Sequence, residues 1–596
     1  MKLFGYCLGL MLLLLPVLPV AQTVVKTDVV KTDSEKLTGL DSTIEQLMKD
    51  WNVPGLAISI VKEDKIIYSK GYGYRDVKKE LPVTPETLFA IGSCTKAFTA
   101  TGLGILVDEG RLQWDKPIRG YLPEFKLHDE YVAGKITASD LLTHRSGLPR
   151  HDGMWYGSPF SRQELLARLQ YLEPNAGFRE LFQYNNLMFM VAGCLTEAIT
   201  KQSWEEFVQT RLLNPLGMKN SNFSVSLLPK ANDYALPYAE QKGEVRGVPF
   251  RNIDAIGPAG AINSNVVEMS NWVMFNLAKG KWNNQQLVSE SAMTQIHSPQ
   301  IVMPGGAVTG EFFYACYGMG WLVTAYRSHL RLEHSGGIDG FTALVSLLPR
   351  QKCGIVILAN LTGAPIHTTI TNIVYDRLLS LEAITWQDRL GKLKAQMKTV
   401  EESKAKEDLQ RLPNTQPAHP LKDYTGKFEH PAYGLLKIEE VGGKLQASFH
   451  GFISPLRHYH YDIFEAEDDV LSKNKLCFLT NVKGEVDKVT SLFEPSVKEL
   501  VFERVVEKKS LDKAALYKFT GDYEIAGSII KISLRGDNLI LAVPGQPEYE
   551  LVAIKEYEFN FKTLTGYSVV FQCDEAGKVT QVAFHQPNGV FAAKKK

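Results

Sequence analysis

Ser93-Cys94-Thr95-Lys96 begins an apolar stretch that is expected to be helical and to end at Gly110. Residues three apart lie on one face of an α-helix, so the Lys96 amine can reach the Ser93 hydroxyl and activate it as a nucleophile. This spacing indicates a serine hydrolase that works without a Ser-His-Asp triad. The chain repeats the spacing at Ser59, Ser403, Ser472, Ser510 and Ser528. Other parts of the chain must therefore show which copy is catalytic.

A second motif, Tyr184-Asn185-Asn186, lies among apolar residues further along the chain. A lysine or tyrosine is a poor base near neutral pH unless burial or a neighbouring charge changes its pKa. A phenol near Lys96 can carry a proton between Ser93 and a leaving group, and the Asn186 amide can orient Lys96 or a substrate carbonyl. The alternative is structural: Tyr184 packs at the start of a core helix and an asparagine caps that helix.

A third motif, His334-Ser335-Gly336-Gly337, lies at the edge of an expected strand. Glycines inside a strand indicate the close approach of another backbone or of a ligand. The amide N–H groups of Gly337 and Ser93 can together form an oxyanion hole, which stabilises a tetrahedral intermediate by a few kcal/mol. The alternative is a tight hairpin turn, and His151-Asp152-Gly153 shows that the pattern His-any-Gly is not rare.

Taken in this order, the three motifs resemble those of the serine β-lactamase and penicillin-binding-protein superfamily. They are most similar to its class C-like branch, which includes D-aminopeptidases and carboxylesterases. Other stretches resemble the same family: Val53-Pro54-Gly55, Leu141 to Leu148, Gly257-Pro258-Ala259-Gly260 and Tyr317-Gly318-Met319-Gly320-Trp321. The resemblance covers about residues 37–385.

The resemblance implies a role for each motif residue. Ser93 is implied to be the acylated nucleophile, and Lys96 and Tyr184 the proton-transfer pair. The amides of Ser93 and Gly337 are implied to form the oxyanion hole. The expected substrate-binding residues are Asn186, His334, Ser335 and Gly336. No metal or organic cofactor is required, and His144 matches a family loop with a structural role.

His334 departs from the family pattern. Penicillin-recognising members commonly have lysine at this place, and its permanent cation holds a substrate carboxylate. A histidine with a pKa of about 6.5 is largely neutral at pH 7. We therefore expect esters, amides or peptides with a D-residue to be better substrates than β-lactams. His334 is expected to orient Tyr184 or the substrate through a hydrogen bond.

The order of expected elements predicts several domains. Strands at both ends of residues 37–385, with helices between them, predict an α/β (α+β) β-lactamase-like domain with an antiparallel sheet and a helical insertion. A charged helical linker is expected at 386–418. Beyond it, Tyr424-Thr425-Gly426 is echoed by Phe519-Thr520-Gly521. The echo predicts two all-β domains at 419–507 and 511–596, related by duplication and similar to the lipocalin-like extensions of some family members.

The composition restricts the location and the partners. Residues 1–21 have a basic start and a short apolar core, which is typical of a secretory signal, although an uncleaved anchor is the alternative. No later stretch reaches the roughly 18 apolar residues of a membrane helix. Lys plus Arg and Asp plus Glu number 66 each, without a basic stripe, which argues against nucleic acid. A small-molecule or peptide substrate is expected.

The sequence therefore predicts a periplasmic or secreted serine hydrolase that acts on an ester, amide or D-residue-containing peptide carbonyl through an acyl-enzyme. One alternative is a non-catalytic receptor or assembly scaffold with the same fold. Within the enzyme class, a weak class C-like β-lactamase is the alternative. The acylation base, Lys96 or Tyr184, stays open because the two groups titrate together.

Overall fold

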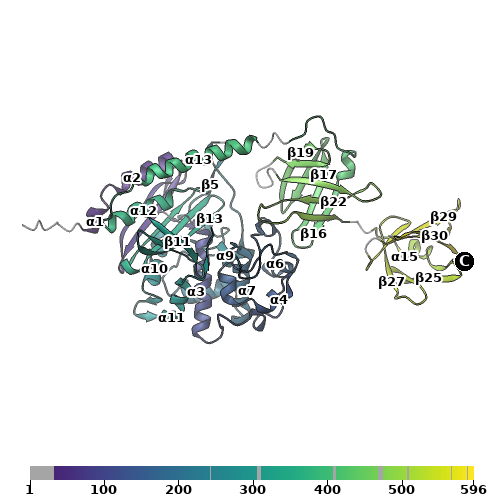
Figure 1. The fold of residues 1–596 in the computed structure, drawn as a ribbon, viewed down its shortest axis with the longest axis horizontal. Helices are drawn as coiled ribbons and strands as arrows, with labels where there is room; N and C mark the ends of the chain where they lie inside the picture. Colours follow the sequence, from purple (N-terminus) through teal and green to yellow (C-terminus); the bar gives the residue numbers. More distant parts are fainter. Residues whose placement is uncertain are drawn as a thin grey trace, which may run out of the picture.

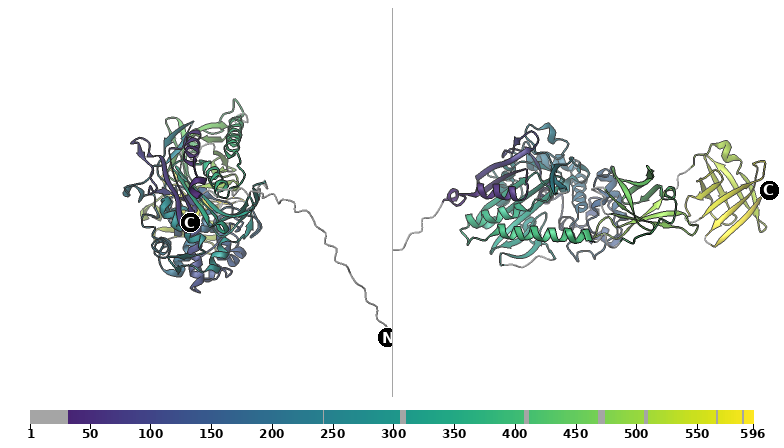
Figure 2. Two further views of the ribbon diagram at one scale, coloured as in Figure 1. Left: turned by 90° about the vertical axis from the view of Figure 1, so that its left-hand side faces the viewer. Right: turned by 90° about the horizontal axis from the view of Figure 1, so that it is seen from above.

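The computed structural model describes residues 32–596 except positions 242, 305–309, 407–410, 468–473, 506–508, 565–566 and 587. The expected signal segment lies outside the described residues. Three units follow one another along the longest axis: a unit of helices and a sheet, a first β-barrel and a second β-barrel (Figure 1). Seen from above, helix α13 (Trp386–Lys406) runs beside the first unit toward the first barrel (Figure 2).

A nine-stranded antiparallel sheet forms the centre of the first unit, in the order β10-β11-β12-β13-β14-β15-β1-β2-β3. Its strands are β1 (Gly55–Lys62), β2 (Lys65–Asp76), β3 (Leu81–Pro82), β10 (Ile301–Val302), β11 (Phe312–Tyr317), β12 (Leu322–Tyr326), β13 (His329–Ile338), β14 (Phe341–Leu348) and β15 (Cys353–Ala359). Strands β1 and β15 pair with Leu56 opposite Ala359, so the two ends of the unit meet inside the sheet. The predicted sheet built from both ends of the domain is confirmed.

Helices cover both faces of this sheet. Alternate residues of β1 enter two different cores, because successive side chains of a strand point to opposite faces. Ile58 and Ile60 join the core beneath α2 (Leu40–Asp50) and α12 (Ile366–Leu378). Ala57 and Val61 join the core on the other face, beneath α10 (Val266–Leu277).

A helical insertion lies between β3 and β10. It contains α3 (Thr95–Asp108), α4 (Glu130–Lys135), α5 (Ala138–Leu142), α6 (Arg162–Arg168), α7 (Asn186–Thr200), α8 (Trp204–Val208), α9 (Gly257–Gly260), α10 and α11 (Glu290–His297). Helix α3 is buried on all sides from Thr95 to Leu106, as expected for a helix at the centre of a large domain. Gly110 follows it with a φ of +68°, which matches the expected end of the apolar helix.

Each C-terminal unit is a closed barrel of eight strands. The first contains β16 (Gly426–His430), β17 (Gly434–Val441), β18 (Lys444–Phe449), β19 (Phe452–His460), β20 (Ile463–Ala466), β21 (Lys475–Thr480), β22 (Val486–Ser491) and β23 (Leu500–Arg504). The second contains β24 (Gly521–Ile525), β25 (Ser528–Arg535), β26 (Asn538–Ala542), β27 (Tyr549–Ala553), β28 (Glu558–Phe561), β29 (Ser568–Cys573), β30 (Val579–Gln586) and β31 (Gly589–Lys595). A short helix precedes each barrel, α14 (Leu421–Tyr424) and α15 (Lys513–Tyr517). The prediction of two all-β domains is confirmed.

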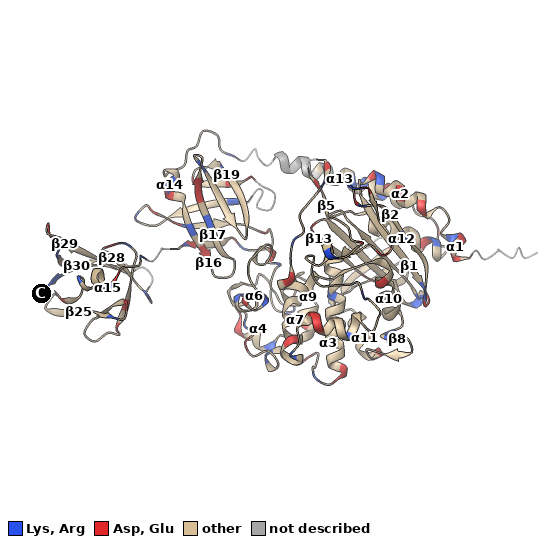
Figure 3. Cartoon of the chain, turned by 180° about the vertical axis from the view of Figure 1, so that it is seen from behind, with Lys and Arg blue, Asp and Glu red and all other residues tan. Residues whose placement is uncertain are grey.

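The two barrels differ in how they join the rest of the molecule. The core of the first barrel, including Tyr433 and Phe449, is continuous with the core of the helical insertion. The second barrel has a separate core around Phe519 and Tyr523. Basic and acidic residues are interspersed along the chain in all three units (Figure 3). Within the described ranges, every helix is too short or too polar to cross a membrane.

Candidate active site

Ser93 and Lys96 lie where two helical segments join. Ser93 is in a short 3₁₀ helix (Gly92–Cys94), and Lys96 is in the first turn of α3, which follows without a break. Lys96 Nζ lies 3.0 Å from Ser93 Oγ. The copy of the motif at Ser528 is on strand β25 instead, where residues three apart point to opposite faces of the barrel wall. The helical context therefore separates Ser93 from this copy.

The Lys96 amine is fully buried and faces two oxygen acceptors. Nζ donates to Asn186 Oδ1 and to the carbonyl oxygen of Ala259, both at 2.8 Å. Burial lowers the pKa of Lys96 well below its usual range, the charge of Asp152 opposes this effect, and the charge of Arg150 adds to it. A neutral amine has two N–H bonds and one lone pair. In the neutral form that burial favours, both N–H bonds can be directed at these two acceptors, and the lone pair then remains for the Ser93 hydroxyl.

Tyr184 lies directly before helix α7. The side chain of Asn185 caps this helix by accepting from the Met188 amide at 3.1 Å, as the structural alternative predicted. The Tyr184 ring also lies 4.9 Å from Lys96 Nζ. Burial raises the pKa of the Tyr184 phenol, and an interaction with the Ser93 hydroxyl opposes this effect only in part. The phenol is therefore protonated at neutral pH and close to the other two groups.

His144 supports the turn that carries Tyr184. The two rings lie 4.2 Å apart between centroids, and the Asn185 amide donates to His144 Nδ1 at 3.0 Å. Burial lowers the pKa of His144 well below its usual range, so the ring is neutral and Nδ1 is free to accept. These contacts agree with the structural role expected for His144.

The backbone around Ser93 packs tightly against strand β13. A Cβ atom added to Gly336 would lie 1.9 Å from the Ile91 carbonyl oxygen and 3.2 Å from the Ser93 amide nitrogen. A Cβ atom added to Gly92 would lie 2.8 Å from the Gly337 amide nitrogen. Glycine at both positions thus allows the amides of Ser93 and Gly337 to come together. A Cβ atom added to Gly337 would meet nothing within 4 Å, so open space lies beside this pair of amides.

Both ring nitrogens of His334 form hydrogen bonds with other groups of the protein. Nδ1 lies 2.6 Å from the Ser335 carbonyl oxygen, which can only accept, so Nδ1 carries the hydrogen. Nε2 accepts from the Tyr317 hydroxyl at 2.8 Å. Burial lowers the pKa of His334 to about 3, and the charge of Lys96 adds to this effect. His334 is therefore neutral, as expected, but its hydrogen bond is to Tyr317, whereas the Tyr184 ring lies 6.3 Å away between centroids.

Two charged residues, Arg150 and Asp152, lie beside these groups. Asp152 Oδ2 accepts from Arg150 Nε at 2.6 Å, and Asp152 Oδ1 accepts from Asn186 Nδ2 at 3.0 Å. A carboxylate can only accept, so this contact fixes the orientation of the Asn186 amide and directs its oxygen at Lys96. Asn186 was expected to orient either Lys96 or a substrate carbonyl, and in the structure its amide oxygen accepts from Lys96. The Arg150 guanidinium lies 5.1 Å above the Tyr184 ring.

The remaining expected site residues differ in exposure. Ser335 is exposed, whereas Gly336 is buried against Ile91.

Cys94, the residue after Ser93, carries a thiol that is buried. Its Sγ donates to the His334 carbonyl oxygen at 3.2 Å, and burial raises the pKa of this thiol to about 12, so it is unsuited to nucleophilic attack. In the part of the chain that the structure describes, no group of three or more His, Cys, Asp or Glu side chains is arranged to hold a metal ion.

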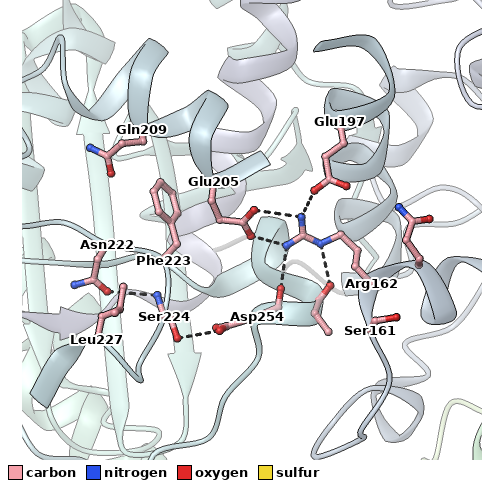
Figure 4. A pocket seen from close by; sticks show the side chains of 12 residues that line it. Ser161, Arg162, Glu197, Glu205, Gln209, Asn222, Phe223, Ser224, Leu227 and Asp254 are labelled. Carbon is pink, nitrogen blue, oxygen red and sulfur yellow. Dashed lines mark hydrogen bonds and ion pairs between the residues drawn. The ribbon is translucent and has the colours of Figure 1, made fainter. Parts of the chain in front are cut away.

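A cavity of about 660 Å³ lies beside Arg162, and its lining does not include Ser93 (Figure 4). The guanidinium has partners at 2.5–3.2 Å: Glu197, Glu205 and the carbonyls of Asp254 and Ala255. These contacts connect α6 with α7, α8 and the segment that leads into α9. Helix α9 carries Ala259, whose carbonyl accepts a hydrogen bond from Lys96. The Arg162 cluster therefore stabilises the segment that positions this acceptor.

Sequence reasoning did not find several residues of this site. Tyr317 and Ala259 lie in stretches that resemble the family, but those stretches did not indicate their contacts with His334 and Lys96. Asp152 lies in His151-Asp152-Gly153, which served only as an example of a common pattern. The position of Asp152 next to the family loop that ends at Leu148 was the signal that could have identified it.

Comparisons with known proteins show to which family the chain belongs. Residues 40–373 match the family model described as Beta-lactamase, and residues 410–504 match a domain of unknown function, DUF3471. A curated relative, unguisins hydrolase ungD′ of Aspergillus campestris, is 29% identical over 416 residues, which cover 66% of this chain and 76% of the relative. Protein flp of Staphylococcus aureus is 30% identical over 332 residues, covering 54% of this chain and 63% of flp.

Among solved structures, the octameric penicillin-binding protein homologue from Pyrococcus abyssi has a TM-score of 0.53 at 22% identity. The match covers 85% of this chain and 98% of that one. At this identity it shows a shared fold alone. The family model, however, spans more than half of the chain. The chain therefore belongs to the β-lactamase family of serine hydrolases.

Proposed function

We propose that this protein is an exported serine hydrolase that forms an acyl-enzyme on Ser93. The contact between Lys96 and Ser93 carries the proposal, since a buried amine with both N–H bonds on acceptors has its lone pair available 3.0 Å from the hydroxyl. Burial of a lysine disfavours its charged form and requires supporting contacts. A non-catalytic scaffold with the same fold would gain nothing from a lysine held in this state.

Acylation would begin with proton transfer from Ser93 to Lys96. The neutral amine is a base as it stands, whereas the Tyr184 phenol would first have to ionise against its raised pKa. As Ser93 Oγ attacks the substrate carbonyl carbon, its proton moves to Lys96 Nζ, and the carbonyl oxygen becomes an oxyanion. The amides of Ser93 and Gly337 are placed to stabilise that charge, which typically lowers such a barrier by about 3 kcal/mol.

Collapse of the tetrahedral intermediate would require a proton for the leaving group. Tyr184 is suited to donate this proton because its phenol stays protonated at neutral pH. Lys96 then returns the proton that it took from Ser93 to the phenolate, which restores both groups. In the second half of the reaction a water molecule would attack the acyl carbon and give a proton to the Lys96–Tyr184 pair. Ser93 Oγ would then leave with a proton from the same pair, which returns both groups to their starting state.

The charges at the site favour esters, amides or peptides with a D-residue over β-lactams. His334 is neutral and buried, so it offers no cation for a substrate carboxylate. The Arg150 guanidinium is already paired with Asp152 at 2.6 Å. The relative named unguisins hydrolase supports a hydrolytic reaction and leaves the substrate of this chain to be measured.

Labelling with a fluorescent alkyl phosphonate tests the nucleophile. We expect the wild-type chain to be labelled, Ser93→Ala to lose labelling, and Ser528→Ala to retain it. Ser528 is a matched control because it has the same spacing to a lysine on an exposed barrel strand. Equal labelling of wild type and Ser93→Ala would overturn the proposal.

A substrate panel and cell fractionation test the remaining parts. We expect turnover of short-chain p-nitrophenyl esters or D-amino-acid amides, and slow turnover of a chromogenic cephalosporin. Rapid cephalosporin turnover would overturn the conclusion drawn from His334. Export predicts that the full-length gene product appears in the periplasm or medium with residues 1–21 removed, and an intact N-terminus on cytoplasmic protein would contradict it.

A further inference from the structure

The first barrel contacts one short segment of the catalytic unit at several points. We name residues 150–160 the rim segment, because it carries Arg150 and Asp152. The amide of Gly153 donates to Glu494 Oε1 at 2.8 Å, and His151 Nδ1 lies 2.8 Å from the Tyr433 hydroxyl. Both barrel residues belong to the domain of unknown function. Two successive parts of the rim segment are thus attached to the barrel.

A third attachment lies at Tyr156. Its ring stacks on Phe452 of the barrel with centroids 5.7 Å apart and planes 8° from parallel, and its carbonyl oxygen lies 3.3 Å from His450 Nδ1. The Tyr156 hydroxyl donates to Asp339 Oδ1 at 2.5 Å. Asp339 follows the last residue of β13, the strand that carries Gly336 and Gly337. The barrel is therefore connected to the rim segment and, through Tyr156, to the end of β13.

Hydrogen bonds link the residue next to Gly153 with Lys96. Asp152 precedes Gly153 and accepts from Asn186 Nδ2 at 3.0 Å, and Asn186 Oδ1 accepts from Lys96 Nζ at 2.8 Å. Without Asp152, the amide of Asn186 is free to turn by 180° and to direct its NH₂ group at Lys96. Two donors would then face each other, and the lone pair of Lys96 would no longer be held toward Ser93.

We propose that the first barrel completes the active site: Glu494 holds the rim segment, Asp152 thereby orients Asn186, and both acidic residues are positioning residues for Lys96. The inference rests on the proposed hydrolase function. It assigns a task to the domain of unknown function, namely to fix the hydrogen-bond acceptor of the catalytic amine. The continuous core of the barrel and the helical insertion gives this contact a rigid base.

Several charged or titratable groups surround Lys96 and Asp152. Those that face Lys96 are Asp152, Arg150, Cys94, His144, His334 and Tyr184. Those around Asp152 are Arg150, Lys96, His151, Tyr184, Tyr433 and Glu494. Removal of the Asp152 carboxylate takes away the negative charge that raises the pKa of Lys96. The acid limb of the pH–rate profile should then move to lower pH.

The test compares full-length variants by the second-order rate of phosphonate labelling at Ser93. We expect Asp152→Ala and Glu494→Ala to lower the rate by roughly 10- to 100-fold, because misplaced catalytic groups typically cost this much. Glu494→Gln keeps an oxygen acceptor for Gly153 and should stay within about twofold of wild type. Lys498→Ala is the matched control, since it removes an exposed ion pair with Glu173 at the same interface.

Hydrogen–deuterium exchange of residues 150–160 gives a readout independent of activity. We expect faster exchange there in Glu494→Ala than in Lys498→Ala, and an acid limb shifted to lower pH in Asp152→Ala. A Glu494→Ala chain with wild-type labelling and wild-type exchange would overturn the inference, as would an unmoved acid limb in Asp152→Ala. If wild type is not labelled at Ser93, the hydrolase proposal fails, and the exchange data still decide whether the barrel holds the rim segment.

Discussion

Replacement of Gly336 by alanine should disable the site through a single backbone clash. The added Cβ atom would lie 1.9 Å from the Ile91 carbonyl oxygen, whereas non-bonded carbon and oxygen atoms stay at least about 3 Å apart. Strand β13 and the segment before Ser93 must therefore separate by about 1 Å. A displacement of this size can reduce a rate by about 100-fold, and the overpacking costs about 1–3 kcal/mol of stability. The expected result is labelling by a small phosphonate at about 1% of the wild-type rate.

Gly337→Ala is the matched control for this experiment. The adjacent glycine would place its Cβ atom in open space and would keep its amide N–H, so its thermal midpoint should stay close to wild type and its labelling rate should fall far less than that of Gly336→Ala. Labelling rates and thermal unfolding midpoints of both variants separate loss of the site from loss of the fold. Wild-type reactivity of Gly336→Ala, or an equal loss in both variants, would refute the account of the glycines.

Two other substitutions probe the same site, and a third probes the Arg162 cluster. Lys96→Arg places a permanent cation beside Ser93 and should lower kcat by at least about 100-fold. In the wild type, activity should fall as the pH drops through the lowered pKa of Lys96, because protonation removes the lone pair. Tyr184→Phe should lower kcat by about 100-fold or more for substrates with poor leaving groups and much less for activated esters, which a comparison of amides with nitrophenyl esters will show. Arg162→Ala should cost about 3 kcal/mol in urea unfolding, because it leaves carboxylates without their partner, whereas exposed Gln163→Ala in the same cavity should cost little.

The sheet, the central helix and the barrels were predictable because local patterns specify them. The apolar run after Lys96 is buried on all sides in α3, and the paired echoes at Gly426 and Gly521 begin corresponding barrel strands. Helix α13 begins at Trp386, where the charged linker was expected to begin. Trp386 Nε1 donates to Asp376 at 2.8 Å, so the start of this helix is anchored on α12 and does not move freely.

The site was predictable only where its residues are close in sequence or belong to a motif. Ser93 and Lys96 are three residues apart, and local helix geometry brings their side chains together. The partner of His334, Tyr317, ends β11, which β12 separates from β13 in the sheet. The alternation of residues does not reveal this arrangement. The contact of Gly153 with Glu494 spans 341 positions and depends on how the first barrel docks on the catalytic unit. Nothing local to either residue encodes that contact.

Because 341 positions separate Gly153 from Glu494, their contact can form only late in the synthesis of the chain. The ribosome adds Gly153 long before Glu494, so a growing chain contains Ser93, Lys96 and Tyr184 for most of its elongation while the acceptor for the rim segment is still absent. A chain terminated early would carry every motif of the catalytic unit but would lack the residue that holds Asp152 in place. Full reactivity would then appear only in molecules translated through the first barrel.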